Sequence, residues 1–335
     1  MISAFLIKRV YWVLLILLCM VPRTQNAIAF GGEAVMPNKQ AVIQNLRGHL
    51  TMLTQTIGER SVIKKENLQK TVAYLHEQFE TYGLAVERQS YPYRNMEATN
   101  VVARFKTAGK SSTHYVLGAH YDSVAGTVGA DDNASAVAVL LETARIMQTG
   151  KQDPEGELQI TFVAFALEEP PVFGTPDMGS RVFAEKAREA SVAIDGMICL
   201  EMVGYTCNEP GCQQFPFPLQ FFGYPDTGDF IGIVGNIKSL GLTHRIKKSF
   251  RQNPHLPVVS LTVPLNGWLM AAVRLSDHAS FWDKGYRAVM LTDSAFFRNP
   301  HYHKASDTMQ TLDFGYMAEL VNNLVVFFNL QMHAK

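Results

Sequence analysis

The segment LQITFVAFA, residues 158–166, is apolar at almost every position instead of at every second one. A strand with one face in water alternates apolar and polar residues, whereas a strand covered on both faces is apolar throughout. The segment therefore predicts a strand inside a sheet that helices cover on both sides. Two acids, Glu168 and Glu169, follow it after Leu167, and Pro170 favours extended backbone at Glu169.

Strand and helix patterns alternate along the rest of the chain, and this order favours an α/β sandwich. Strand patterns lie at residues 85–91, 98–105, 113–120, 196–204 and 287–293. Helical patterns lie at about residues 38–58, 61–82, 133–147, 181–189 and 312–332.

Length and charge limit the function classes. The 335 residues are 47% hydrophobic and 18% charged, which is enough for one large core, and no linker or repeat divides the chain. Thirty basic residues balance thirty acidic ones, so no long-range field attracts nucleic acid. We expect one domain over residues 30–335 and no nucleic-acid partner.

The amino terminus has the pattern of a targeting segment. Lys8 and Arg9 precede an apolar run at residues 10–21, and Ala27 to Ala29 suit cleavage before Phe30. The run is shorter than the roughly 20 residues of a spanning helix. A signal peptide over residues 1–29 therefore predicts a secreted or periplasmic protein, with no stable membrane insertion after cleavage. The alternative is a retained membrane anchor.

The cysteines leave two alternatives open. Cys207 and Cys212 flank a Pro-Gly turn, and an oxidising compartment would permit a disulfide between them. Two free thiols on a loop are the other possibility. Cys199, inside an apolar run, is expected to be a small buried residue.

Charged residues stand at the end of three predicted strands. His120 and Asp122 end the first, Glu168 and Glu169 follow the second, and Glu201 ends the third. The crevice outside the carboxyl ends of such strands is where open α/β sheets bind ligands. A solvated loop acid would explain any one of these residues, but the coincidence of three favours a binding site.

Two further segments carry donor residues. GADDNAS, residues 129–135, precedes a helix, but capping that helix needs one polar residue, worth about 1 kcal/mol, and does not explain three in a row. FFRNPHYHKASDT, residues 296–308, offers His301 and His303. Histidines and carboxylates gathered in one crevice would suit zinc and require no thiolate.

Six blocks resemble, in order, the signatures of the co-catalytic di-zinc aminopeptidase family. That family includes bacterial leucyl aminopeptidases and glutamate carboxypeptidases, and glutaminyl cyclases are its relatives. The likeness spans about residues 117–308, and the blocks are GAHYDS, GADDNASAVAVLLETAR, ALEEPP, CLEMVGY, SDHASFW and NPHYHKASDT. The resemblance implies a three-layer α/β/α sandwich with a central mixed, mostly parallel sheet and two zinc ions per chain.

The resemblance also implies roles for individual residues. His120 and Glu201 would ligate one zinc, Glu169 and His303 the other, and Asp132 would bridge both, with Glu168 as general base and Asp122 orienting His120. A cis peptide bond would follow Asp132. Many family members have aspartate where this chain has Glu201, which leaves occupancy of that site open, and we interpret the unmatched His301 as a flanking residue.

The expected function is an exported zinc exopeptidase, an aminopeptidase that acts on a peptide or aminoacyl substrate. A glutaminyl cyclase-like acyltransferase with one zinc, a carboxypeptidase or dipeptidase of the same fold, and a catalytically silent relative are the alternatives. No partner protein is indicated.

Substrate preference is less constrained. Arg274 and Arg298 are candidate partners of a substrate carboxylate, with a structural role as the alternative. A hydrophobic first residue would be favoured by five apolar residues if they border the crevice and are not part of the core: Phe296, Phe297, Tyr205, Trp268 and Met270.

Overall fold

The computed structural model describes residues 38–109, 113–150 and 157–332. The signal peptide expected over residues 1–29 lies outside the described residues. Within the described ranges, no helix combines the length and the apolar composition that crossing a bilayer requires.

Helices and strands alternate much as the sequence predicts. The strands are β1 (Ala85–Tyr93), β2 (Met96–Lys106), β3 (Thr113–His120), β4 (Leu158–Phe165), β5 (Gly196–Glu201), β6 (Ile231–Asn236), β7 (Val258–Val263) and β8 (Ala288–Thr292). The helices are α2 (Lys39–Thr51), α3 (Lys65–Thr81), α4 (Ala136–Thr149), α5 (Gly179–Glu189), α6 (Leu240–Phe250), α7 (His278–Asp283) and α8 (Phe314–Gln331).

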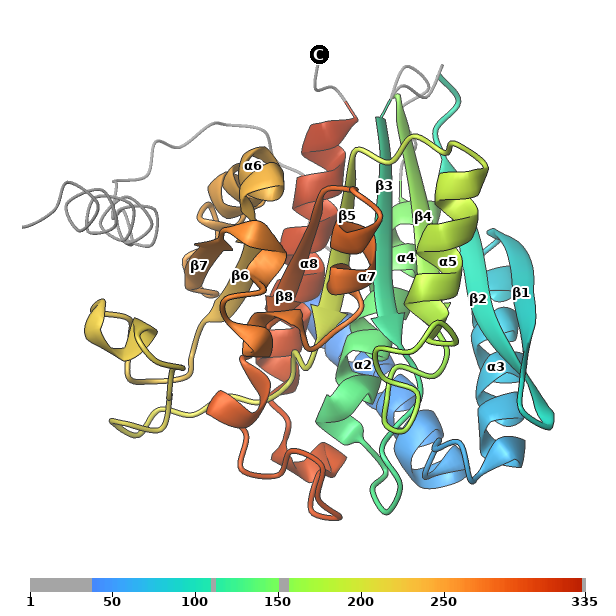
Figure 1. Ribbon diagram of the computed structural model, residues 1–335, viewed down its shortest axis with the longest axis horizontal. Helices are drawn as coiled ribbons and strands as arrows, with labels where there is room; N and C mark the ends of the chain where they lie inside the picture. The colour runs from blue at the N-terminus through green and yellow to red at the C-terminus, as the bar shows by residue number, and fades with distance from the viewer. Residues whose placement is uncertain (1–37, 110–112, 151–156, 333–335) are drawn as a thin grey trace, which may run out of the picture.

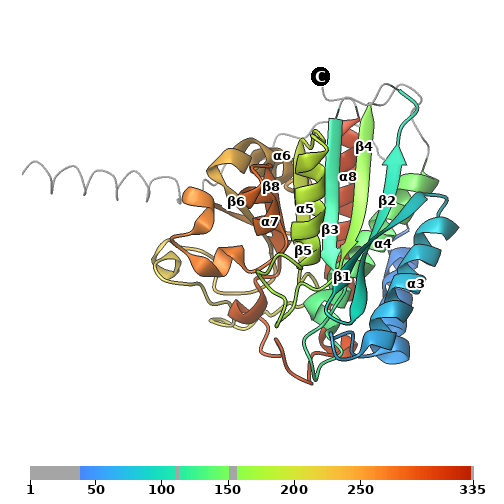
Figure 2. The same cartoon turned by 45° about the vertical axis from the view of Figure 1, so that its right-hand side comes forward.

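The strands form one eight-stranded mixed sheet between two layers of helices, which confirms the predicted fold class. Its order is β1-β2-β4-β3-β5-β8-β6-β7, with β4, β3, β5 and β8 parallel to one another. Figure 1 shows α5 and α7 on the near face and α4 and α8 behind the sheet. Figure 2 separates the layer of α5 and α7 from that of α3 and α4.

Strand β4 explains why residues 158–166 are apolar throughout. Ile160 and Phe162 belong to the core cluster on the α4 and α8 side, whereas Val163 and Phe165 belong to the cluster on the α5 and α7 side. Both faces of the strand are therefore removed from water, and neither face tolerates a regular polar position.

The sequence predicts no element between residues 205 and 286, where the structure has β6, α6, β7 and α7. These elements have weak local signals. Strand β6 contains two glycines, β7 is an edge strand with three half-buried residues at its start, and α7 has six residues. Packing against β8 and α8, rather than local propensity, stabilises this part of the sheet.

The parallel strands bring their carboxyl ends to one edge of the sheet, the lower edge in Figure 1. In the register of β3 with β4, His120 lies opposite Phe165, so the residues after both strands emerge at the same level. Glu201 is the last residue of β5, which is also parallel to β3. The predicted functional residues thus share one edge.

A buried histidine makes the stability of the α2–α3 contact depend on pH. The ring of His49 contacts the hydroxyl groups of Tyr74 and Tyr82 at 2.6 and 3.3 Å. Burial, with a smaller effect of Arg145, lowers the pKa of His49 to about 4. The unfolded chain binds this proton near pH 6.5, so the unfolded state gains protons first as the pH falls.

We therefore expect His49 to remove about 3 kcal/mol from the free energy of unfolding between pH 6.5 and pH 4. Denaturant unfolding of wild type and His49→Gln over this range isolates its contribution, because the other histidines are common to both. Glutamine does not titrate, so parallel curves for the two proteins would contradict the assignment.

Candidate metal centre

Two groups of side chains at the carboxyl edge of the sheet have the spacing of metal ligands. The first is His120, Asp132 and Glu201, and the second is Asp132, Glu169 and His303. Within each group the donor atoms lie within 4.8 Å of one another. Asp132 belongs to both groups, so the structure brings together all five residues that the sequence assigns to metal.

The two carboxylate oxygens of Asp132 face different histidines. Oδ1 lies 3.5 Å from His120 Nε2, and Oδ2 lies 3.1 Å from His303 Nε2. Glu201 Oε2 is 3.4 Å from His120 Nε2, and Glu169 Oε2 is 3.3 Å from His303 Nε2. This is the arrangement that a carboxylate bridging two cations requires.

The unsatisfied atoms of this cluster fit bound cations. Neither ring nitrogen of His120 has a hydrogen-bond partner among the described residues, and neither does Glu169 Oε1, although all three atoms are buried. Buried polar groups without partners are costly, and a cation between the donors would satisfy them. Imidazole and carboxylate donors without a thiolate suit zinc, so the residues present fit the metal that the sequence predicts.

The pKa values of Glu169 and His303 are shifted because these side chains lie close to other charged groups in a buried cluster. Burial raises the pKa of Glu169 to about 8, with Asp132 adding to the rise. Burial opposes ionisation of His303 too, but its contacts with Asp132 and Glu169 outweigh this and raise its pKa to about 10. Positive charge therefore stabilises the closely spaced carboxylates of this cluster, and protons or metal cations can supply it.

A turn before α4 places Asp132. The backbone N–H groups of Asp131 and Asp132 donate to the two carboxylate oxygens of Asp307, at 2.9 and 3.2 Å. The peptide bond from Asp132 to Asn133 is cis, as the resemblance implies. Both residues have non-helical backbone angles, so α4 begins at Ala136 and not at residue 133.

The neighbours of Asp132 hold the turn in place. Asn133 Nδ2 donates to Leu200 O, and its Oδ1 accepts from Met202 N–H, which ties the turn to the end of β5. Asp131 accepts from Gly204 N–H and from Asn299 Nδ2. Of the polar residues in GADDNAS, Asp132 thus faces the metal groups while Asp131 and Asn133 fix the backbone.

Asp122 lies beside His120 but makes its hydrogen bonds elsewhere. Its two oxygens accept from the N–H groups of Glu168 and Glu169, each at 3.0 Å. Its Oδ1 is 3.5 Å from His120 Nδ1, longer than a hydrogen bond. The orienting role expected of Asp122 stays a prediction, and the structure adds a second role in holding the Glu168–Glu169 turn.

Glu168 belongs to neither metal group but points into the same cluster. Its Oε2 lies 3.8 Å from His120 Nε2, and its side chain is buried. Burial raises the pKa of Glu168 well above its usual range, and the nearby Glu169 and Glu201 add to the rise. A carboxyl group with a raised pKa, close to the metal groups, suits proton transfer.

Two residues that support the site, Ser276 and Arg60, are not predicted from the sequence to have a role there. Ser276 donates to Glu201 Oε2 at 2.6 Å, from the block SDHASFW. Arg60 is fully buried, and no pattern around it signals a function. Its guanidinium holds the loop after β3 by donating to five carbonyls, those of Leu53, Gly58, Tyr121, Val128 and Gly129.

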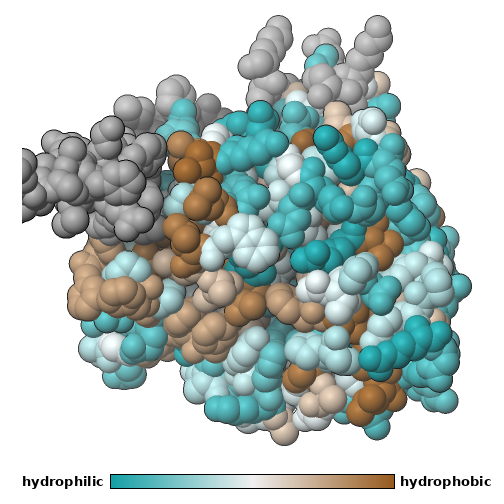
Figure 3. Space-filling view, viewed as in Figure 1, coloured by the Kyte–Doolittle hydropathy of each residue, from teal (hydrophilic) through white to brown (hydrophobic). Residues whose placement is uncertain are grey.

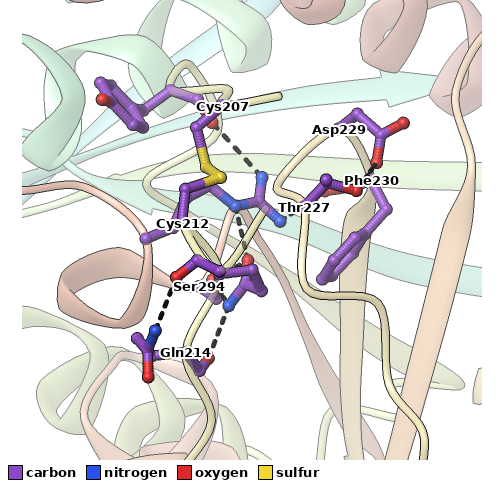
Figure 4. The surroundings of a disulfide bond; sticks show 11 residues. Cys207, Cys212, Gln214, Thr227, Asp229, Phe230 and Ser294 are labelled. Carbon is purple, nitrogen blue, oxygen red and sulfur yellow. Dashed lines mark hydrogen bonds between the residues drawn. A yellow bond between two sulfur atoms is a disulfide. The ribbon is translucent and has the colours of Figure 1, made fainter. Parts of the chain in front are cut away.

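The loop after β5 is closed by a disulfide between Cys207 and Cys212 (Figure 4). Gln214 N–H donates to Phe297 O, and Gln213 bonds to Ser294 and Arg298. Arg298 also donates to Phe230 O, so its contacts are structural. Cys199 is free and buried, as predicted.

An apolar hollow of about 110 Å³ opens beside the metal groups. Glu201 lines it, together with aromatic and aliphatic residues that include Phe215, Phe230, Ile233, Met290, Phe296 and Phe297.

The other residues proposed to border the crevice lie elsewhere. Tyr205 packs against His301, Met270 packs against the core on the α7 side, and Trp268 lies at a second hollow. His301 is in neither metal group, and its Nδ1 contacts Ser306.

The sequence matches the model of peptidase family M28 over residues 100–328. It is 36% identical over 295 residues to the uncharacterized protein YfbL of Escherichia coli K12, an alignment that covers 86% of this chain and 88% of that protein. It is 25% identical over 244 residues to leucine aminopeptidase 1 of Fusarium vanettenii, covering 70% of this chain and 55% of the relative. The chain thus spans about half the length of that aminopeptidase.

Solved structures share the fold at low identity. The LapA aminopeptidase of Legionella pneumophila has a TM-score of 0.67 at 19% identity, over 93% of this chain and 78% of that one. BSAP, a zinc aminopeptidase from Bacillus subtilis, has a TM-score of 0.65 at 13% identity, over 88% and 95%. Porphyromonas gingivalis glutaminyl cyclase has 0.63 at 17%, over 89% and 100%.

Proposed function

The chain belongs to peptidase family M28, and from this premise we propose that it is a zinc aminopeptidase that removes the first residue from peptides. One observation carries the proposal: Asp132 belongs to two candidate metal groups at once, and Glu168 lies beside them without belonging to either. This arrangement favours a two-metal hydrolase over a one-zinc acyltransferase of the same fold.

The proposed roles follow from the contacts of each side chain. His120 and Glu201 would hold one zinc, Glu169 and His303 the other, with Asp132 between them. When bound, zinc supplies a Lewis acid that polarises the scissile carbonyl and brings the pKa of a water to about 7. Glu168 would take a proton from the attacking water and return it to the amine that leaves.

The apolar hollow supports an aminopeptidase with a preference for hydrophobic first residues. Glu201 lines the hollow and also belongs to a metal group, so a side chain in the hollow would hold the adjoining peptide bond close to Glu168. Export through a cleaved segment of residues 1–29, and a single domain over residues 30–335, are also proposed, on the sequence pattern described above.

Leucine p-nitroanilide is expected to be hydrolysed by the zinc-loaded protein, and its N-acetyl derivative to resist hydrolysis. Chelation should abolish turnover and zinc should restore it. Chelation should also lower the free energy of unfolding by about 4 kcal/mol for each zinc position that was held at free zinc of about 1,000 times its Kd, because the metal binds only the folded chain. Calorimetry measures this loss without reference to activity.

The other candidate functions predict different results with these substrates and with a glutaminyl peptide. Cleavage of the acetylated substrate at a rate close to that of the free amine would exclude an aminopeptidase. Ring closure of an amino-terminal glutaminyl peptide, without anilide hydrolysis, would identify an acyltransferase. A silent relative would turn over none of these substrates at full zinc loading.

A further inference from the structure

A second hollow, of about 220 Å³, lies between the amino-terminal ends of α5 and α7. Its floor is small and buried, formed by Ser276, Ala279 and Ser280, and its rim carries Phe173 and the exposed Trp268. Figure 3 shows the face that carries both helices, where teal surface over α5 meets brown and pale surface below α7. Nothing in the proposed chemistry uses this hollow.

The second hollow adjoins the apolar hollow and the metal groups. Leu275 lines both hollows, so they are adjacent. The next residue, Ser276, lines the second hollow and donates to Glu201, which lines the first. On the other side, Phe173 N–H donates to the carbonyl of Glu169. A substrate with its first side chain in the apolar hollow therefore has the second hollow beside the bond to be cleaved.

The second hollow is positively charged. Its two charged lining residues are Arg181 and Arg274, and no acid lines it. Arg274 is already bound, because it donates to Asn266 O and Asp283 and lies 3.8 Å over the ring of Trp268. One carboxylate, that of Asp283, pairs with both guanidinium groups, so the ion pairs of the described residues leave one positive charge in excess at this hollow.

Arg181 carries that surplus charge. Its single ion pair among the described residues is with Asp283, at 3.5 Å, longer than N–H···O hydrogen bonds usually are. Its Nε is buried and has no hydrogen-bond partner in the part of the chain that the structure describes. A guanidinium N–H that lacks a partner can donate to a carboxylate, and such charge-assisted hydrogen bonds are stronger than those between neutral groups.

We propose that Arg181 binds the free carboxyl terminus of the substrate, which makes short peptides, dipeptides and tripeptides, the preferred substrates. The inference rests on the proposed aminopeptidase function and adds the substrate class. Each residue beyond the cleaved bond extends the chain by about 3.3–3.6 Å. Only a peptide with one or two such residues would place its carboxylate in a hollow that adjoins the metal groups.

The test compares Leu-Ala with its amide, Leu-Ala-NH₂, on the zinc-loaded protein. We expect kcat/KM for the free acid to exceed that for the amide by about tenfold or more, the size expected of a charge-assisted contact. In Arg181→Gln this ratio should fall to about one. The ratio is taken within one preparation, so incomplete folding or zinc loading of the variant cancels.

Arg188→Gln is the matched control. It removes an exposed arginine from the same helix, outside the lining of the hollow, and should keep the wild-type ratio. A ratio near one in wild type would overturn the inference while leaving the proposed function in place, because anilide hydrolysis tests that function separately. A preference for the free acid in wild type that is unchanged in Arg181→Gln would also overturn the inference.

Binding gives a second readout that does not depend on turnover. A ketomethylene analogue of Leu-Ala, which cannot be hydrolysed, and its amide can be titrated calorimetrically into the wild type and both variants. Tighter binding of the free acid by about tenfold in wild type and Arg188→Gln, and equal affinities in Arg181→Gln, are expected. Equal affinities in all three proteins would refute the site.

Discussion

Glu168→Gln is expected to lower kcat by about 10²- to 10⁴-fold while both metal groups still bind zinc. The amide fills the same buried space but cannot take a proton from water. Glu168 is in neither metal group, so its replacement removes no metal ligand. Zinc content and kcat, measured on the same preparation with leucine p-nitroanilide as substrate, test the retained metal binding and the lost turnover together.

Two results would contradict the general-base assignment. One is turnover within a few fold of wild type at full zinc content. The other is loss of zinc from Glu168→Gln, which would make Glu168 a ligand. Glu169→Gln is the matched comparison, because the neighbouring acid belongs to one metal group and its loss should reduce zinc content as well as kcat.

Asp132→Ala is expected to weaken zinc binding at both positions, because Asp132 is the one residue common to the two groups. The loss in affinity should exceed about 100-fold at each position, since replacing residues that only contact metal ligands already costs about 10- to 100-fold. Activity should disappear with the metal. Zinc per chain after dialysis against a buffered free zinc concentration measures the effect.

Glu201→Ala is the control for the bridging role, since Glu201 belongs to only one group. It should lose one zinc and retain the other, whereas Asp132→Ala should lose both. Retention of one zinc by Asp132→Ala would show that Asp132 does not connect the positions. Far-UV circular dichroism at each zinc concentration separates metal loss from unfolding.

Local sequence was sufficient for much of the fold because the core strands are buried on both faces. Continuous apolar runs such as residues 158–166 have that origin, and the charged residues that follow them mark the strand ends. Prediction failed for β6, whose run is interrupted by two glycines, for β7, which is only half-buried at its start, and for α7, which has six residues.

The candidate site was predictable as a set of residues, but the contacts within it were not. His120, Asp132, Glu169, Glu201 and His303 stand out as polar residues in the blocks of the resemblance, and the structure places them together. That Asp122 holds two backbone N–H groups, or that Arg60 supports the loop after β3, has no periodic or spacing signature.

The two arginines considered for substrate binding show the same limit. Arg298 is buried against Gln213 and Phe230, and Arg274 is paired with Asp283. Arg181, which no pattern distinguished, has a buried Nε–H without a hydrogen-bond partner among the described residues. Sequence alone determined the layered sheet and the edge that carries the site, because burial is encoded in each strand and the alternation of strands and helices makes the strands parallel, while the resemblance named the donor residues. The tertiary structure decided which charges are paired and which hollows adjoin, because those contacts join segments far apart in the chain.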